Sequence, residues 1–212
     1  EPSPSGTLPS GTLPSGTAPA DSGAPGVDEA DLEVVRRQLG RRPRAVLAVA
    51  HRCSCGLPDV VETAPRLEDG TPFPTLYYLT CPRASAAVSR LESAGVMREM
   101  TARLAADPEL AAAYRAAHRD YLARRDARGV LPGSPSAGGM PDRVKCLHVL
   151  VAHSLAAGPG VNPFGDEVLA AIGDWGTRGP CVQPCGQPVT GPSANRRPAS
   201  GGSAPEGEET AG

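Results

Sequence analysis

Cysteine and histidine are the residues of this chain whose side chains can ligate a transition metal or act as nucleophile and base; there are six of the first and four of the second. The candidates fall in three places along the chain: Cys53 with Cys55, Cys81 alone, and Cys146 with His148 and His153. Thiolate and imidazole are ligands that Zn²⁺ takes in tetrahedral sets of four. A metal centre built from distant segments is therefore the first hypothesis.

The zinc hypothesis needs the fold to bring separate segments together. Its predicted ligands are Cys53, Cys81 and Cys146, with Cys55, His148 or His153 as the fourth. The Cys-x-Cys pair is not the usual Cys-x-x-Cys, and no second pair follows at zinc-finger spacing. The sequence thus predicts a Cys/His metal-binding domain without a known finger pattern.

Helix geometry limits what the last group of ligands can do together. A long helix is predicted from Asp142, as its N-cap, to Ala157. On an ideal helix, Cys146 and His153 lie about 20° apart around the axis but ~10.5 Å apart along it, and His148 projects about 160° away from Cys146. Such a helix offers no more than one of these three side chains to a single metal.

Two other interpretations of the thiols stay open. Free cysteine is among the most buried residue types, so the thiols can simply pack in the core of a non-catalytic protein. Alternatively, Cys146 lies near a predicted helix N-terminus beside Arg143 and Lys145, where positive charge favours the thiolate. A thiol-dependent enzyme would then use Cys146 as nucleophile, with His153 or His118 as the base.

The remaining sequence signals are mostly negative. Cys181 and Cys185 lie in a stretch dominated by Pro and Gly, and we interpret this Cys-x3-Cys pair as incidental. The sequence contains no Walker loop, dinucleotide-binding glycine fingerprint, Gly-x-Ser-x-Gly or His-Glu-x-x-His motif. These absences disfavour the common nucleotide-binding, hydrolase and zincin classes.

Composition divides the chain into three parts. Residues 1–26 are rich in Pro, Gly and Ser and contain a five-residue repeat, and residues 176–212 are rich in Gly and Pro. Such segments bury too little apolar surface to offset their chain entropy, so both are predicted to be disordered tails. Residues 27–175 are predicted to form a single domain.

Within that domain, short apolar runs come first and helical patterns follow. The predicted strands span residues 45–50, 60–63 and 75–80, and the predicted helices span 28–39, 83–94, 96–105, 108–127, 142–157 and 167–172, with a turn at 162–167. This order predicts an α+β fold in which a small N-terminal β-sheet packs against a C-terminal set of helices.

Charge and hydropathy exclude some partners. The net charge is −2, and acidic and basic residues balance within residues 27–175, so the sequence predicts no binding to nucleic acid. No apolar run approaches the roughly 20 residues of a membrane span. No signal-peptide pattern opens the sequence, which predicts a cytoplasmic protein whose cysteines are thiols or metal ligands rather than disulfides.

Several stretches in a fixed order resemble a known family. They are Arg-Cys at 52–53 with Gly-Leu-Pro at 56–58, Thr-Ala-Pro-Arg-Leu at 63–67, Asp-Gly-Thr-Pro-Phe-Pro-Thr-Leu at 69–76, Tyr-Leu-Thr-Cys-Pro at 78–82, Arg-Val-Lys-Cys-Leu-His at 143–148 with Ala-His at 152–153, and Asn-Pro-Phe-Gly at 162–165. Together they resemble the bacterial family called domain of unknown function 501, over about residues 32–175. That family has no assigned activity, so the resemblance implies no catalytic residues. Its genes in actinobacteria often neighbour those of a septum-formation initiator and an exopolyphosphatase, which implies a partner in cell division or a role in polyphosphate metabolism.

Overall fold

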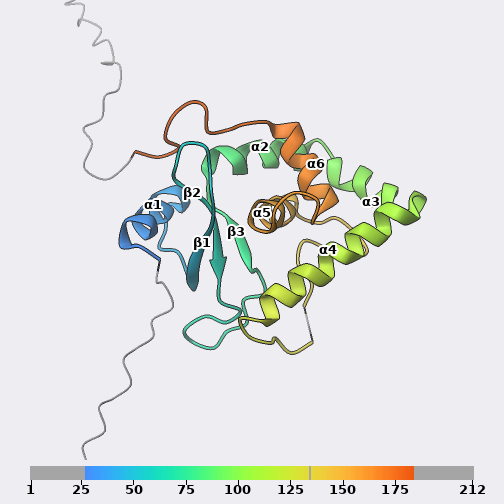
Figure 1. The fold of residues 1–212 in the computed structure, drawn as a ribbon, viewed down its shortest axis with the longest axis horizontal. Helices are drawn as coiled ribbons and strands as arrows, with labels where there is room; N and C mark the ends of the chain where they lie inside the picture. Colours follow the sequence, from blue (N-terminus) through green and yellow to red (C-terminus); the bar gives the residue numbers. More distant parts are fainter. Residues whose placement is uncertain (1–26, 134, 184–212) are drawn as a thin grey trace, which may run out of the picture.

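The structure is a computed structural model that describes residues 27–133 and 135–183. The strands are β1 (Val46–Arg52), β2 (Pro58–Thr63) and β3 (Tyr77–Leu79), and the helices are α1 (Glu29–Leu39), α2 (Pro82–Ser93), α3 (Val96–Ala106), α4 (Pro108–Asp126), α5 (Leu147–Ala157) and α6 (Pro163–Ile172). A small sheet lies against a set of helices (Figure 1), and the predicted α+β class is confirmed. The tail predicted at 1–26, and all of the tail predicted at 176–212 beyond residue 183, lie outside the described residues.

The three strands form one antiparallel sheet in the order β1-β2-β3. Val61 pairs with Val49 on one side and with Tyr78 on the other. Because side chains alternate along a strand, Tyr77 and Leu79 point to one face and Tyr78 to the other. Tyr77 and Leu79 belong to the main hydrophobic core, as does Val60. The sheet therefore has a core face, and a second face that α1 approaches through β2.

Helix α5 occupies the centre of the molecule. Figure 1 shows it between the sheet and helices α4 and α6, with α2 along another side. Leu147, Leu150 and Val151 have no exposed surface. A helix that is apolar on every side is stable only when other elements cover it completely, and here β3, α2 and α6 all contact it.

The helix predicted to have Asp142 as its N-cap has Cys146 in that position instead, four residues later, so that part of the prediction is wrong. The reason is competition for backbone donors. The Lys145 N–H donates to a carbonyl of the preceding glycine loop at 2.7 Å, and the Val144 N–H donates to the Thr101 Oγ1 atom of α3 at 3.0 Å. These contacts hold the segment in a loop, and Asp142 caps no helix.

The turn predicted at 162–167 is also wrong, because α6 starts at Pro163. Asn162 is its N-cap, and its Oδ1 atom accepts a hydrogen bond from the Gly165 N–H at 3.1 Å. The fixed φ angle of proline suits the first helical position, so the Asn-Pro pair signals the start of a helix rather than a turn. None of the described helices is both long enough and apolar enough to cross a membrane.

Helices α5 and α6 approach each other closely at one glycine. A Cβ atom at Gly165 would clash with the Leu150 carbonyl and with the Ser154 hydroxyl of α5. We expect Gly165→Ala to lower the free energy of unfolding by about 1–3 kcal/mol, because the helices must separate to admit one methyl group. Urea unfolding followed by circular dichroism measures the change.

Ala171→Ser is the matched control, since it adds one heavy atom at an exposed position of the same helix. Its free energy of unfolding should stay within about 0.5 kcal/mol of the unmodified chain. Equal stability of both variants would show that the helices are not in contact at Gly165.

Candidate metal centre

The first two thiols are held by a tight turn at the end of β1. The Cys53 N–H donates to the Leu57 carbonyl at 3.1 Å, and the Gly56 N–H donates back to the Cys53 carbonyl at 2.8 Å. Gly56 adopts a φ of 83°, which a side chain would strain. Closing the turn brings the thiols of Cys53 and Cys55 into contact with each other.

Cys81 is the N-cap residue of α2 and is fully buried. Its thiol contacts the thiol of Cys181 and lies near the backbone N–H groups of Arg83 and Ala84 at the start of α2, although the side chain makes no capping hydrogen bond. These contacts hold the pKa of Cys81 below its ordinary value, although burial acts in the opposite direction. Donors at a helix N-terminus stabilise negative charge, so this position favours a thiolate.

The segment after α6 carries Cys181 to the same place. The Ser54 hydroxyl donates to the Asp174 Oδ1 atom at 2.8 Å, which ties this segment to the Cys53–Cys55 turn. Further on, the Arg83 guanidinium donates to two backbone carbonyls, those of residues 179 and 180, at 2.6 and 3.0 Å. Cys181 itself accepts a hydrogen bond from the Gln38 Nε2 atom of α1 at 3.3 Å.

Four thiols from three separate segments thus gather beside the start of α2, and we call them the thiol cluster: Cys53, Cys55, Cys81 and Cys181. Their contacts run in series from Cys53 to Cys55, from Cys55 to Cys181, and from Cys181 to Cys81. In this part of the described chain, no three of the sulfur atoms all lie within 4.8 Å of one another. Zinc–sulfur bonds of about 2.3 Å at tetrahedral angles place sulfur atoms ~3.8 Å apart, so a bound metal would draw the cluster closer together.

Burial and neighbouring thiols raise the pKa values of two members of the thiol cluster. Burial, followed by the contact with Cys55, raises the pKa of Cys53 to about 12. The Cys81 thiol, together with burial, raises the pKa of Cys181 well above its ordinary value. Neighbouring thiols cannot all lose their protons in a buried place without a cation to balance the charge. A divalent metal supplies that balance and deprotonates the thiols that it binds.

A second group of ligand atoms lies at the other end of α2, and we call it the His148 cluster: Glu92, Cys146 and His148. One atom of each side chain lies within 4.8 Å of the other two. Cys146 is the N-cap of α5, with extended backbone angles, and not a residue inside the helix. The angle of about 160° that was predicted to keep Cys146 and His148 apart therefore does not apply.

His148 is held by α2 on both sides of its ring. Its Nδ1 atom lies 3.2 Å from the Glu92 Oε1 atom, and its Nε2 atom lies 3.1 Å from the Ser85 hydroxyl and 3.2 Å from the Ser85 carbonyl. Contact with Cys146, followed by the charge of Glu92, raises the pKa of His148 to about 9. This shift favours the imidazolium form of the ring at neutral pH.

Cys146 also borders a cavity of about 340 Å³ between the glycine loop and the start of α5. Arg143 and Lys145 line the same cavity, with Asp142 as an acidic neighbour. The Glu92 carboxylate accepts a hydrogen bond from the Leu147 N–H at 2.7 Å and so caps α5. This corner combines a half-exposed thiol, an imidazolium and two further cations.

The two clusters are separate. Cys81 begins α2, and Glu92 lies eleven residues further along it, which is about 16 Å of helical rise. Of the predicted zinc ligands, the structure brings Cys53, Cys55 and Cys81 together and places Cys146 with His148 in the other cluster.

His153 belongs to neither cluster. It is fully buried, and its Nε2 atom lies 2.9 Å from the Asp120 Oδ2 atom. Its Nδ1 atom lies 3.3 Å from the Asn162 Nδ2 atom, so both ring nitrogens have partners. Burial lowers the pKa of His153 despite the Asp120 carboxylate. This arrangement is a neutral core histidine that donates to Asp120 and accepts from Asn162.

His118, the other candidate base, lies on α4. Its electrostatic neighbours are Arg125 and Asp142, and burial lowers its pKa. Its Nε2 atom is buried without a partner among the residues that the structure describes. The histidine that reaches Cys146 is His148, which sequence reasoning had considered only as a metal ligand.

Two residues of these clusters were not among the predicted site residues. Cys181 was taken as incidental because its neighbours are Pro and Gly, although its Cys-x3-Cys spacing was a signal for a ligand. Glu92 gave no signal, since a glutamate near the end of a predicted helix is ordinary. Cys185 lies outside the described residues.

The comparisons with known proteins give one match. No curated protein and no solved structure matches the chain. The sequence profile of a family described as "Protein of unknown function (DUF501)" matches residues 49–170, which include both clusters except for Cys181. The match covers more than half of the chain and agrees with the motifs at 56–58, 69–76 and 143–148. The chain therefore belongs to the DUF501 family.

Proposed function

We propose that this domain binds one zinc ion through the thiol cluster, and that the ion stabilises the fold rather than performing a reaction. Four protein thiolates fill the tetrahedral coordination of zinc, and such closed sets are typical of structural sites. The ion would join the end of β1, the start of α2 and the segment after α6. These segments are far apart in the sequence.

The observation that carries the proposal is the gathering of four thiols from separate segments, with polar groups beside the sulfur atoms. The Cys181 sulfur accepts a hydrogen bond from the Gln38 Nε2 atom at 3.3 Å, and nearby backbone amides act to lower the pKa values of Cys53 and Cys81. Thiols that only fill apolar space need no donors, whereas metal-bound thiolates are commonly supported by such outer hydrogen bonds. A cytoplasmic location fits the proposal, because reducing conditions keep the thiols available for a metal.

Zinc content tests the proposal directly. We expect the full chain, purified without chelator, to carry about one equivalent of zinc, and Cys181→Ser or Cys55→Ser to lose most of it, because three ligands hold the ion less tightly than four. Elemental analysis gives the stoichiometry. Cobalt substitution should give a thiolate-to-metal charge-transfer band in the unmodified chain that is lost in both variants.

Cys146→Ser is the matched control, because it removes a half-exposed thiol from the other cluster. It should keep the full equivalent of zinc. Zinc that disappears with Cys146→Ser but survives Cys181→Ser would place the metal in the His148 cluster and overturn the proposal. A zinc-free protein with all thiols titratable would show that the cysteines only pack, and a shortage of titratable thiols would show a Cys81–Cys181 disulfide.

A second function is favoured by the His148 cluster: thiol chemistry at Cys146. The imidazolium of His148 lies against the Cys146 sulfur and the cavity gives access to it. A cation beside a thiol favours the thiolate, which is the nucleophilic form. In this arrangement Glu92 keeps His148 charged and oriented, and Arg143 and Lys145 would favour an anionic substrate.

The rate of alkylation measures this activation. We expect iodoacetamide to modify Cys146 about tenfold faster at pH 7 in the unmodified chain than in His148→Gln, since the variant lacks the imidazolium. The pKa of His148 is about 9, so the ring is charged below that pH and neutral above it. The difference between the two proteins should therefore be full at pH 7 and shrink as the pH rises through 9. Mass spectrometry of the peptide that contains Cys146 gives the rate.

Ser89→Ala is the matched control, since it removes only a weak contact between the Ser89 hydroxyl and the His148 Nε2 atom at 3.4 Å. His153→Gln would not serve as a control, because His153 is buried in the core. The rate of Ser89→Ala at pH 7 should match that of the unmodified chain. If His148→Gln reacts as fast as the unmodified chain at every pH, Cys146 is not activated by its neighbours.

A further inference from the structure

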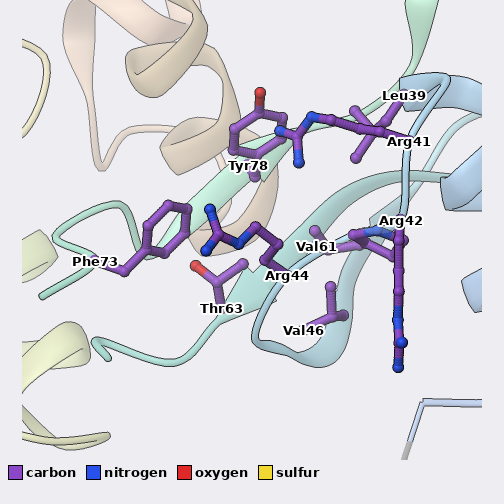
Figure 2. Close-up of a pocket in the computed structure, with 10 residues that line it drawn as sticks. Leu39, Arg41, Arg42, Arg44, Val46, Val61, Thr63, Phe73 and Tyr78 are labelled. Carbon is purple, nitrogen blue, oxygen red and sulfur yellow. The ribbon is translucent and has the colours of Figure 1, made fainter. Parts of the chain in front are cut away.

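The second face of the sheet carries a pocket that neither cluster uses. Figure 2 shows it, with a volume of about 340 Å³. Its apolar floor comes from Val46 of β1, Val61 of β2 and Leu39 at the end of α1. Tyr78 of β3 and Phe73 of the β2–β3 connection add two aromatic rings. Pockets of this size with an apolar floor and a few convergent polar groups are typical of small-molecule sites.

The polar groups of this pocket are cationic. Arg41 and Arg44 line it and are exposed. In Figure 2, the Arg41 guanidinium lies beside Tyr78, and the Arg44 guanidinium reaches toward Phe73 and Thr63. Arg42, between them in the sequence, points away from this group. Two planar guanidinium groups therefore converge on one apolar space.

Neither of these two guanidinium groups has a hydrogen-bonded partner among the described residues. Within residues 27–133 and 135–183, no hydrogen bond or ion pair engages the side chain of Arg41 or Arg44. Many other arginines of the described surface have carboxylate partners: Arg36, Arg37, Arg52, Arg103, Arg124 and Arg128. Asp69 is within electrostatic reach of Arg44, but its Oδ1 atom already accepts from the Thr71 N–H at 2.9 Å.

The backbone beside the pocket is unusual. Ala45, between Arg44 and Val46, adopts a φ of 53°, and it is the non-glycine residue with positive φ in the part of the chain that the structure describes. Its carbonyl accepts a hydrogen bond from the Ala64 N–H at 2.7 Å, which holds it in place. Strained residues persist where the surrounding structure holds them, and they are frequent at ligand sites.

We propose that this pocket binds a small phosphomonoester that carries an aromatic or apolar group. Guanidinium groups match the oxygens of a dianionic phosphoryl group through paired, charge-assisted hydrogen bonds. Arg41 and Arg44 would hold the phosphoryl group at the rim. The Thr63 hydroxyl would not donate to it, because this hydroxyl already donates to the Thr75 carbonyl at 2.5 Å. The organic group would lie between Phe73 and Tyr78, above Val46 and Val61.

Phenyl phosphate is the probe, and titration of the isotope-labelled full chain by nuclear magnetic resonance is the measurement. We expect saturable shifts in the backbone amides of residues 44–46 and 61–63. Inorganic phosphate lacks the ring, phenol lacks the anion and benzoate carries only one negative charge, so each should bind at least about tenfold more weakly. Benzoate binding as tightly as phenyl phosphate would overturn the phosphoryl assignment.

Two variants test the residues. Arg44→Gln and Arg41→Gln should each weaken phenyl phosphate binding at least about tenfold, because each removes one charged donor. Both side chains are exposed, so the variants should give unchanged spectra away from the pocket. Arg115→Gln, an exposed arginine on α4, is the control and should bind as the unmodified chain does. An equal loss in Arg115→Gln, or no saturation at about 10 mM probe, would overturn the proposal.

Discussion

The central position of α5, with Leu147, Leu150 and Val151 buried, is the constraint on which the rest of the structure depends. Its apolar side chains need cover on all sides, and the sheet, α2, α4 and α6 are arranged around it. Its polar groups must then find partners inside the protein, and they do: His153 lies between Asp120 and Asn162, and the Ser154 hydroxyl donates to the Asn162 carbonyl. A polar network that is fully paired keeps a core in one arrangement, whereas an unpaired member would be costly. His153, a candidate ligand in the sequence, is thus a buried member of the hydrogen-bond network in the core around α5.

Helix α2 connects the core around α5 with both clusters of ligand atoms. It contacts α5 along one side, and its two ends each hold a group of ligand atoms. At its start, the backbone amides of the first turn lie near the Cys81 thiol, while its last turn supplies Glu92 to the start of α5. The separation of about 16 Å between these ends follows from the length of the helix and makes one shared site impossible. This geometry keeps the two proposed kinds of chemistry apart, with metal binding at one end of α2 and thiol activation at the other.

Sequence analysis predicted the bounds of helices and strands better than it predicted which side chains contact one another. Periodicity and capping signals placed the strands and most helices close to their observed bounds, because these signals are local: Asp28 and Gly40 flank α1, and the Asp-Pro pair opens α4. The start of α5 was missed because Thr101, in another helix, competes for the backbone donors. The thiols of Cys53, Cys55 and Cys81 lie in one cluster, but the position of Cys146 depends on where α5 begins. An error of four residues at one helix start therefore moved a predicted ligand out of one site and hid its contact with His148.

Cys181 decides what kind of metal site the thiol cluster can be. The family profile spans residues 49–170 and so contains Cys53, Cys55 and Cys81, three ligands that alone would leave a coordination position open for water or a substrate. Cys181 lies beyond that span, on a segment that Ser54 and Arg83 hold against the turn and the start of α2. With its sulfur between those of Cys55 and Cys81, the proposed zinc ion would have four thiol ligands, which would leave no position for a reacting molecule. Under the proposed function, the segment after α6 would therefore make this a structural site that joins the two ends of the domain rather than a catalytic one.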